Sequence, residues 1–168
     1  ARLVAGLLEH HDRSHFEIYG YHTRHYADTD TALARALCKE FVQGLPFEAL
    51  AEKIRNDALH VVIYPEIGMD AVTVKLASLR LPAIQCTSWG HPITSGMPTI
   101  DYYLSSDLME PEGAERSYTE KLVRLPNLSV HYTPPIYPRR SLSRPELGVR
   151  DAAVVIRPGV VVGHEVVP

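Results

Sequence analysis

The stretch ALHVVIY at residues 58–64 and the stretch PAIQCTSW at residues 82–89 decide the fold. Both are short, nearly continuous apolar runs, and the residues between them, DAVTVKLASL at 70–79, have a helical pattern that Asp70 can cap. An apolar run of this length that is flanked by helices is typical of a strand buried in a parallel sheet. The pattern therefore predicts a β-α-β unit.

The same pattern continues on both sides of this unit. Apolar residues at helical or alternating spacing predict helices at 3–8, 31–42 (capped by Asp30 or Thr31), 47–56 and 111–118, and strands at 16–22, 101–105 and 121–125. Strands that alternate with helices specify a Rossmann-like α/β fold, in which helices cover both faces of a parallel sheet. Because no N-cap residue precedes the first helix, we expect the chain to begin inside it, with the first strand of the fold missing.

Length and charge narrow the class of protein. The chain has 168 residues, about one domain, and its 17 basic and 20 acidic residues give a net charge of −3. This balance argues against a nucleic-acid partner, which needs a basic face to neutralise phosphates. No apolar run of about 18 residues and no signal-peptide layout is present, so no membrane partner is expected. The two cysteines, Cys38 and Cys86, indicate buried reduced thiols in a cytoplasmic protein.

The tail differs in composition from the rest of the chain. Residues 127–168 hold six of the 13 prolines, and five arginines crowd the middle of this segment. Prolines break regular helices and strands. We therefore expect an N-terminal lobe at 1–135, followed at 136–168 by a linker that leads into the start of an absent second lobe.

Polar loops follow the expected strands. In parallel α/β sheets, ligands bind outside the carboxyl ends of the strands. The loop after the first apolar run contains Glu66 and Asp70, and the loop after the second contains Gly90, His91, Thr94, Ser95 and Gly96. Glycines let the backbone approach a polar ligand closely, and a histidine titrates near neutral pH. These loops are therefore the candidate site.

Each of these residues also has a plainer explanation. A Gly-His-Pro turn can simply reverse the chain, and Glu66 and Asp70 can be a loop residue and a helix cap. His60 lies inside an expected strand, where a packed core histidine is expected. Five more histidines, at positions 10, 11, 15, 22 and 25, lack the spacing of a compact ligand set, so no metal site is expected.

Several common catalytic motifs are missing from the sequence. It contains no P-loop, no G-x-G-x-x-G and no G-x-S-x-G motif. This disfavours P-loop NTPases, simple dinucleotide enzymes and serine hydrolases.

A pattern of several short motifs in fixed order runs through residues 58–135: LR at 79–80, PAIQ at 82–85, WGHP at 89–92, TSG at 94–96, DY at 101–102 and EKL at 120–122. This pattern closely resembles glycosyltransferase family 41, which contains O-GlcNAc transferases, SPINDLY-type O-fucosyltransferases and bacterial protein glucosyltransferases. The loop YPEIGMD at 64–70 resembles the bacterial form, and His91 stands where animal and plant members usually have tyrosine.

The resemblance implies one lobe of a two-lobed GT-B fold, truncated at both ends, from a protein whose lobes often follow tetratricopeptide repeats. It implies an inverting, metal-independent enzyme without a cofactor, which moves a sugar, expected to be GlcNAc from UDP-GlcNAc, to protein Ser or Thr. The partners are then a protein acceptor and a nucleotide-sugar donor, the donor held by the missing lobe. The resemblance places His91 as the catalytic candidate, with Glu66, Asp70, Gly90, Pro92, Thr94, Ser95 and Gly96 as substrate-binding candidates.

Two alternatives stay open at this point. The UDP-GlcNAc 2-epimerases also pair two Rossmann-like lobes, but they act on a free nucleotide-sugar and need no protein acceptor. A non-catalytic binding remnant of an enzyme would keep the fold and lose the chemistry. As one lobe of a glycosyltransferase, the isolated chain is expected to transfer no sugar, because half of a GT-B cleft cannot hold the leaving nucleotide.

Overall fold

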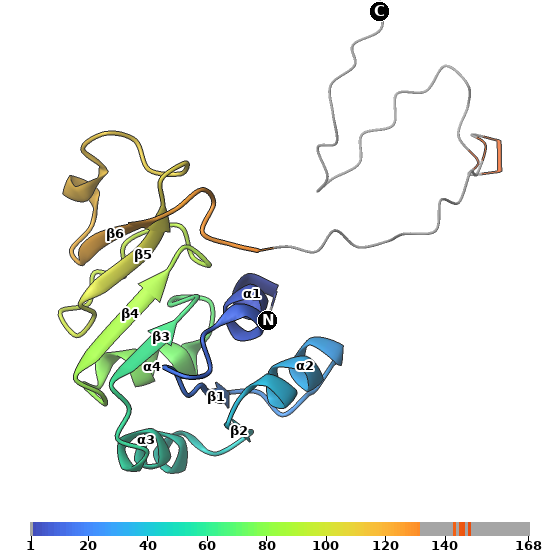
Figure 1. Cartoon of the computed structure of the whole chain (residues 1–168), viewed down its shortest axis with the longest axis vertical. Coiled ribbons are helices and arrows are strands. Elements are labelled where there is room, and N and C mark those ends of the chain that lie inside the picture. Colours follow the sequence, from blue (N-terminus) through green and yellow to red (C-terminus); the bar gives the residue numbers. More distant parts are fainter. Residues whose placement is uncertain (1, 132–142, 144, 147, 149–168) are drawn as a thin grey trace, which may run out of the picture. The chain divides into compact units, whose positions relative to one another are not determined.

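The computed structural model describes residues 2–131 together with residues 143, 145, 146 and 148. The chain divides into two compact units, Ala1–Thr133 and Pro134–Pro168. The elements of the first unit, in chain order, are α1 (Arg2–His10), β1 (Tyr19–His22), α2 (Thr29–Leu37), β2 (Glu40–Gln43), α3 (Phe47–Asn56), β3 (Val61–Tyr64), α4 (Ala71–Ser78), β4 (Ile84–Ser88), β5 (Tyr102–Ser106), the 3-10 helix η1 (Ala114–Ser117) and β6 (Lys121–Leu125) (Figure 1).

Every strand pair in the first unit is parallel, which confirms the predicted α/β class. A four-stranded sheet has the order β3-β4-β5-β6, and a separate two-stranded sheet pairs β1 with β2. Only the β3–β4 connection of the larger sheet is an α-helix, because a long loop joins β4 to β5 and η1 lies between β5 and β6. The Gly90–Gly96 loop is therefore part of a helix-free crossover.

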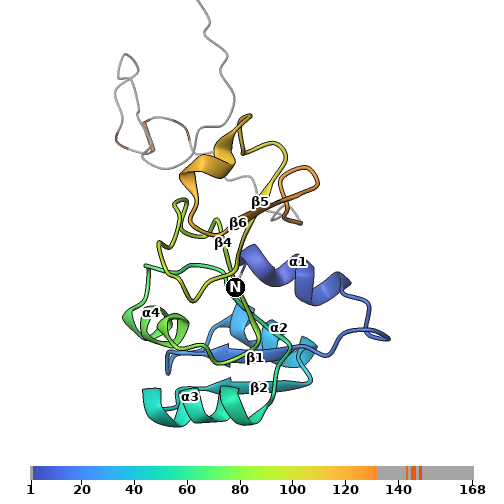
Figure 2. The same ribbon diagram turned by 90° about the vertical axis from the view of Figure 1, so that its left-hand side faces the viewer.

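Helices lie on both sides of the four-stranded sheet. Figure 2 shows α1 on one side and α4 on the other. Ala77 and Leu76 of α4 pack with Tyr64 of β3 in a core that α3 completes. On the opposite side, Val4 and Leu7 of α1 lie over Ile63. The predicted cover of both faces is thus present, although the α1 side is only partly covered.

The region from residue 31 to residue 42 differs from its predicted form. The single predicted helix is wrong: α2 ends at Leu37, and β2 follows at Glu40–Gln43. Phe41 and Val42 instead pair with Gly20 and Tyr21 of β1, an interaction with residues about twenty positions away that local periodicity does not report. The helix cap is Asp28, whose side chain accepts from the Thr31 backbone N–H at 2.8 Å, rather than Asp30 or Thr31.

The burial of β3 also differs from expectation. Val61 and Ile63 are 44% and 42% exposed, so this strand is buried on one face only. His60, expected in the core, is exposed just before the strand. Of the two thiols expected to be buried and reduced, both are free, but only Cys86 is buried and Cys38 is half-buried.

Most of the tail predicted as a linker lies outside the described residues. Within the second unit, the Ser143 backbone N–H and hydroxyl both donate to the Glu146 carboxylate, at 2.7 and 2.6 Å. The Gly148 N–H donates to the Pro145 carbonyl at 2.9 Å. These bonds define a short turn.

Candidate functional site

The loops after β3 and β4 meet at Gly68 and His91. Gly68 has φ +105°, a conformation that favours glycine, and a Cβ at this position would lie 3.5 Å from the His91 ring. Because β3 and β4 are neighbours in the sheet, their following loops come together as predicted from the strand-end rule. The predicted candidates Gly90, His91 and Pro92 sit in the turn that leaves β4, where Pro92 is exposed and His91 is half-buried.

The two predicted carboxylates of the first loop have different surroundings. Glu66 is exposed, and its backbone carbonyl accepts from Met69 in a tight turn. Asp70 caps α4 by accepting from the backbone N–H and the hydroxyl of Thr73, both at 2.9 Å. Burial on its own would raise the pKa of Asp70, but the bonds from Thr73 and a further bond from Thr23 outweigh it and hold that pKa below its usual value. Asp70 is thus occupied as a helix cap.

A tyrosine hydroxyl holds the backbone of His91 through a hydrogen bond. The buried Tyr103 of β5 donates its hydroxyl to the His91 carbonyl at 2.9 Å. Burial, with the nearby charges of Glu110 and Glu120, raises the pKa of Tyr103 to about 12, so the hydroxyl stays protonated and remains a donor at neutral pH. This bond uses only the backbone carbonyl of His91, and the His91 ring lies beside Gly68.

Thr94 and Ser95 are held by a carboxylate that sequence analysis did not single out. Glu120, directly before β6, accepts from the Thr94 hydroxyl at 2.6 Å, from the Ser95 backbone N–H at 2.8 Å and from the Ser95 hydroxyl. Its side chain is buried, at 5% exposure. Burial would raise the pKa of Glu120, but the hydroxyl and backbone donors more than offset this and lower it.

The structure therefore divides the predicted loop in two. The His91 ring lies near Gly68 of the loop after β3, whereas the Thr94 and Ser95 side chains donate to Glu120. Gly96, at φ +66° with open space around it, completes the turn that follows. The sequence offered one signal for Glu120, which is the first residue of the EKL motif.

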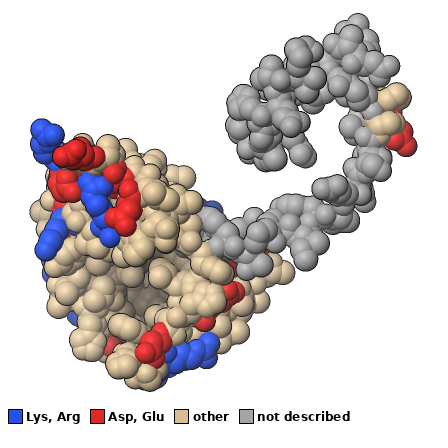
Figure 3. All heavy atoms as spheres, turned by 45° about the horizontal axis from the view of Figure 1, so that its top comes forward, with Lys and Arg blue, Asp and Glu red and all other residues tan. Residues whose placement is uncertain are grey.

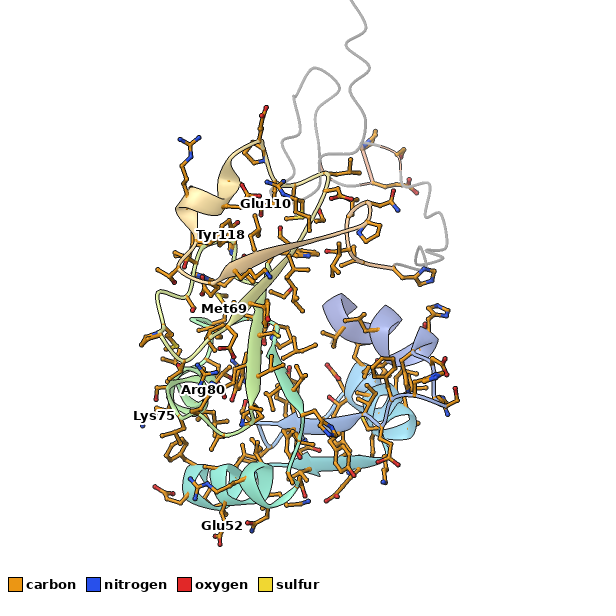
Figure 4. All side chains as sticks on the ribbon, turned by 60° about the vertical axis from the view of Figure 1, so that its left-hand side comes forward. Glu52, Met69, Lys75, Arg80, Glu110 and Tyr118 are labelled. Atoms are coloured by element: carbon orange, nitrogen blue, oxygen red, sulfur yellow. The ribbon has the colours of Figure 1, made fainter. Side chains whose placement is uncertain are left out.

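A second hydrogen-bonded group supports this loop from the β5–β6 side. The Tyr118 ring packs against Tyr103 in a tilted arrangement, with ring centroids 4.5 Å apart, and the Tyr118 hydroxyl donates to Glu110 at 2.7 Å. Figure 4 shows Glu110 and Tyr118 side by side. Ser105 also donates to Glu110, and Arg124 donates to the Glu110 backbone carbonyl at 2.7 Å. The polar groups of this β5–β6 region are therefore hydrogen-bonded to one another.

Three of the short motifs, LR at 79–80, PAIQ at 82–85 and DY at 101–102, join at the other end of the sheet. Arg80 donates to the Asp101 carboxylate at 2.6 Å, and the same oxygen accepts from the Gln85 backbone N–H at 2.8 Å. The fully buried Gln85 side chain donates to the carbonyls of Ala77 and Thr99 and accepts from Tyr64. These bonds fix the strand starts, so this part of the pattern serves the fold.

A small, shallow pocket lies on the α1 side of the strand ends. Trp89, directly before Gly90, lines it together with Val4 and Leu7 of α1. The Trp89 indole N–H donates to the Ser129 hydroxyl at 2.8 Å across the sheet. This pocket could not be predicted from the sequence, because the packing of α1 against the strand ends creates it. Much of the face seen in Figure 3 lacks charged side chains, with acidic and basic groups gathered at its margins.

Within residues 2–131 and the four described tail positions, no three His, Cys, Asp or Glu side chains gather as a metal site. No helix in the described part of the chain is long and apolar enough to cross a membrane.

The fold has a clear counterpart among solved structures. It matches a mutant of the Thermobaculum terrenum O-GlcNAc transferase with a TM-score of 0.72 and 27% sequence identity, over 79% of this chain and 26% of that one. The structure is therefore that of part of the catalytic region of a GT-B glycosyltransferase. The model of the family described as glycosyl transferase family 41 matches residues 1–131. The chain belongs to glycosyltransferase family 41.

Curated relatives extend this result. A tomato (Solanum lycopersicum) protein described as a probable UDP-N-acetylglucosamine–peptide N-acetylglucosaminyltransferase SPINDLY is 29% identical over 149 residues, which cover 81% of this chain. A UDP-glucose:protein N-beta-glucosyltransferase of Actinobacillus pleuropneumoniae is 37% identical over 87 residues, or 52% of this chain. The chain spans only 16% and 14% of the lengths of these two relatives.

Proposed function

We propose that the chain is the amino lobe of the catalytic region of a protein glycosyltransferase. The proposed reaction moves a sugar, GlcNAc from UDP-GlcNAc, to Ser or Thr of a protein acceptor in the cytoplasm, with inversion and without a metal or cofactor. The family match over residues 1–131 is the observation that carries this proposal. Both relatives are described as transferring sugar to peptide or protein, which favours a protein glycosyltransferase over a nucleotide-sugar epimerase.

In this proposal the described lobe forms the sugar and acceptor side of the cleft. His91 is the side chain proposed to meet substrate, because it is half-buried where the loops after β3 and β4 converge. The exposed Glu66 and Pro92 are proposed to lie at the rim. Thr94 and Ser95 contribute through the loop backbone, because their hydroxyls donate to Glu120.

Transfer also needs groups that stabilise the departing nucleotide diphosphate, such as a cation or a helix N-terminus. Asp70 occupies the N-terminus of α4 and makes that position unsuitable for a phosphate. We therefore expect the donor diphosphate to be held by a second lobe, and the 168-residue chain to transfer no sugar by itself.

The test is a radiolabelled transfer assay with UDP-GlcNAc and Ser/Thr-containing acceptor peptides. The chain is assayed alone and fused to the remaining catalytic region of the Thermobaculum terrenum enzyme. We expect label in peptide only with the fusion, and its loss when His91 is changed to Ala. Transfer by the isolated chain at the rate of a complete enzyme would refute the division between lobes. An active fusion that His91→Ala leaves unchanged would return His91 to a turn-forming role.

A further inference from the structure

The buried Glu120 carboxylate has only neutral hydrogen-bond donors. It accepts from Thr94, from Ser95 twice, and from the Thr119 hydroxyl at 3.2 Å. Among the described residues, no Lys, Arg or His side chain forms an ion pair with it. Burying a carboxylate is unfavourable unless hydrogen bonds replace its hydration. One short loop segment supplies most of these hydrogen bonds to Glu120.

That segment is fixed at both ends. The Tyr103 hydroxyl holds the His91 carbonyl, and Glu120 holds Thr94 and Ser95. Only Pro92 and Ile93 lie between these two points, and the proline ring fixes φ at one of them. The backbone from His91 to Ser95 therefore has little freedom to move.

The two holding groups come from adjacent strands. Tyr103 of β5 pairs directly with Leu122 of β6, two residues after Glu120. Their separation is thus set by the ladder between β5 and β6. Ile93, between the two points, is 60% exposed, so the loop is restrained through its backbone and polar groups rather than by apolar burial.

We propose that Glu120 is a positioning residue of the transfer site: by holding Thr94 and Ser95, it fixes the place of the His91 imidazole beside Gly68. Its meaning for catalysis rests on the proposed function, but the positioning itself is a property of this chain. Glu120 does not touch the proposed substrate side, since its oxygens are directed to the loop's own donors.

The donors make the effect of each substitution specific. The Ser95 backbone N–H can only donate, so Glu120→Ala leaves it without its partner. Thr94→Val keeps both Ser95 bonds to the carboxylate and removes the Thr94 bond, together with the bonds of the Thr94 hydroxyl to Thr119 and to the Gly96 N–H. Glu112→Ala, an exposed glutamate in the same β5–β6 connection, is the matched control.

The experiment uses NMR on the 168-residue chain, following the His91 ring signals and the exchange rate of the Ser95 amide. In Glu120→Ala we expect this amide to exchange about 10-fold faster or more and the His91 ring signals to move. Thr94→Val moves the His91 signals in the same direction to a smaller extent, and Glu112→Ala changes neither readout.

The proposal is overturned if Glu120→Ala leaves the His91 ring signals in place, whatever the Ser95 amide does. If Glu120→Ala does not fold, Thr94→Val decides by the same criterion. The readout needs no sugar transfer. A fusion with the remaining Thermobaculum terrenum catalytic region that transfers no sugar would therefore count against the proposed function, while the positioning result stands.

Discussion

Gly68 combines a positive φ of +105° with contact to the candidate His91 ring. We predict that Gly68→Ala lowers the free energy of unfolding by about 2–3 kcal/mol, because a side chain strains this backbone conformation. Gly96→Ala, at φ +66° in open space, costs about 1 kcal/mol. Urea unfolding of both variants measures the difference.

A double variant separates backbone strain from crowding. The ring of His91 would lie at ordinary van der Waals distance from the new methyl group, so His91→Ala does not restore the stability of Gly68→Ala. Recovery to the wild-type value in the double variant would show that the cost comes from the ring instead of the backbone.

The candidate residues could be predicted from sequence only in part. Gly68 and His91 follow neighbouring strands, and the strand-end rule was enough to bring their loops together. The role of Thr94 and Ser95 was not predictable in this way, because it depends on Glu120, about 25 positions further along the chain. Hydroxyls in a glycine-rich loop suggest ligand contacts, and only the fold shows that these ones are occupied.

At the scale of the elements, Asp70 and Asp28 cap α4 and α2 through the same Asp-x-x-Thr arrangement. We predict that Asp70→Ala destabilises the chain by about 1 kcal/mol, and that Asp70→Asn restores most of the loss. The same exchange at Asp28 costs less, because that carboxylate is more exposed to solvent. Thermal unfolding of the four variants, including Asp28→Asn, provides the comparison. If Asp70→Ala leaves the unfolding temperature unchanged, the capping role is contradicted and Asp70 would be available for a ligand.

Two helices show where the spacing of apolar residues is sufficient to predict an element and where it is not. The helix predicted at 47–56 matches α3 residue for residue, since its apolar stripe faces the core through Leu50, Ala51 and Ile54. The helix predicted at 31–42 failed at its second half, where Phe41 and Val42 gain more from pairing with β1 than from extending α2. Local spacing predicts elements whose stability is local, and misses strands whose partner is distant.

At the scale of the whole molecule, several carboxylates titrate below their usual range in the folded state. The bonds from Arg80 and Gln85 lower the pKa of Asp101 below 3.8, and the donors around Glu120 outweigh its burial and lower that pKa below 4.5. A lowered folded pKa stabilises the fold above the unfolded value, and this stability is lost as pH falls through the folded value. We predict a flat unfolding temperature from pH 7 to about 5 and a decline below about pH 4.

Variants of these acids test the assignment. Asp101→Asn removes part of the decline at low pH, whereas Glu52→Gln, an exposed position on α3, leaves it unchanged. If the unfolding temperature of Asp101→Asn falls at low pH as steeply as that of the wild type, groups other than Asp101 cause the decline. The measurement is thermal unfolding in a series of buffers of equal ionic strength.

The one-sided burial of β3 has a practical consequence. This strand ends the four-stranded sheet, so in the described part of the chain its outer edge lacks a ladder partner, and Val61 and Ile63 are exposed beside it. An unprotected strand edge with branched side chains is a template onto which further copies can add. Concentrated solutions of the chain should therefore aggregate through this edge. A single substitution such as Val61→Lys, at the start of β3 and away from the candidate loops that follow β3 and β4, should keep the protein dispersed.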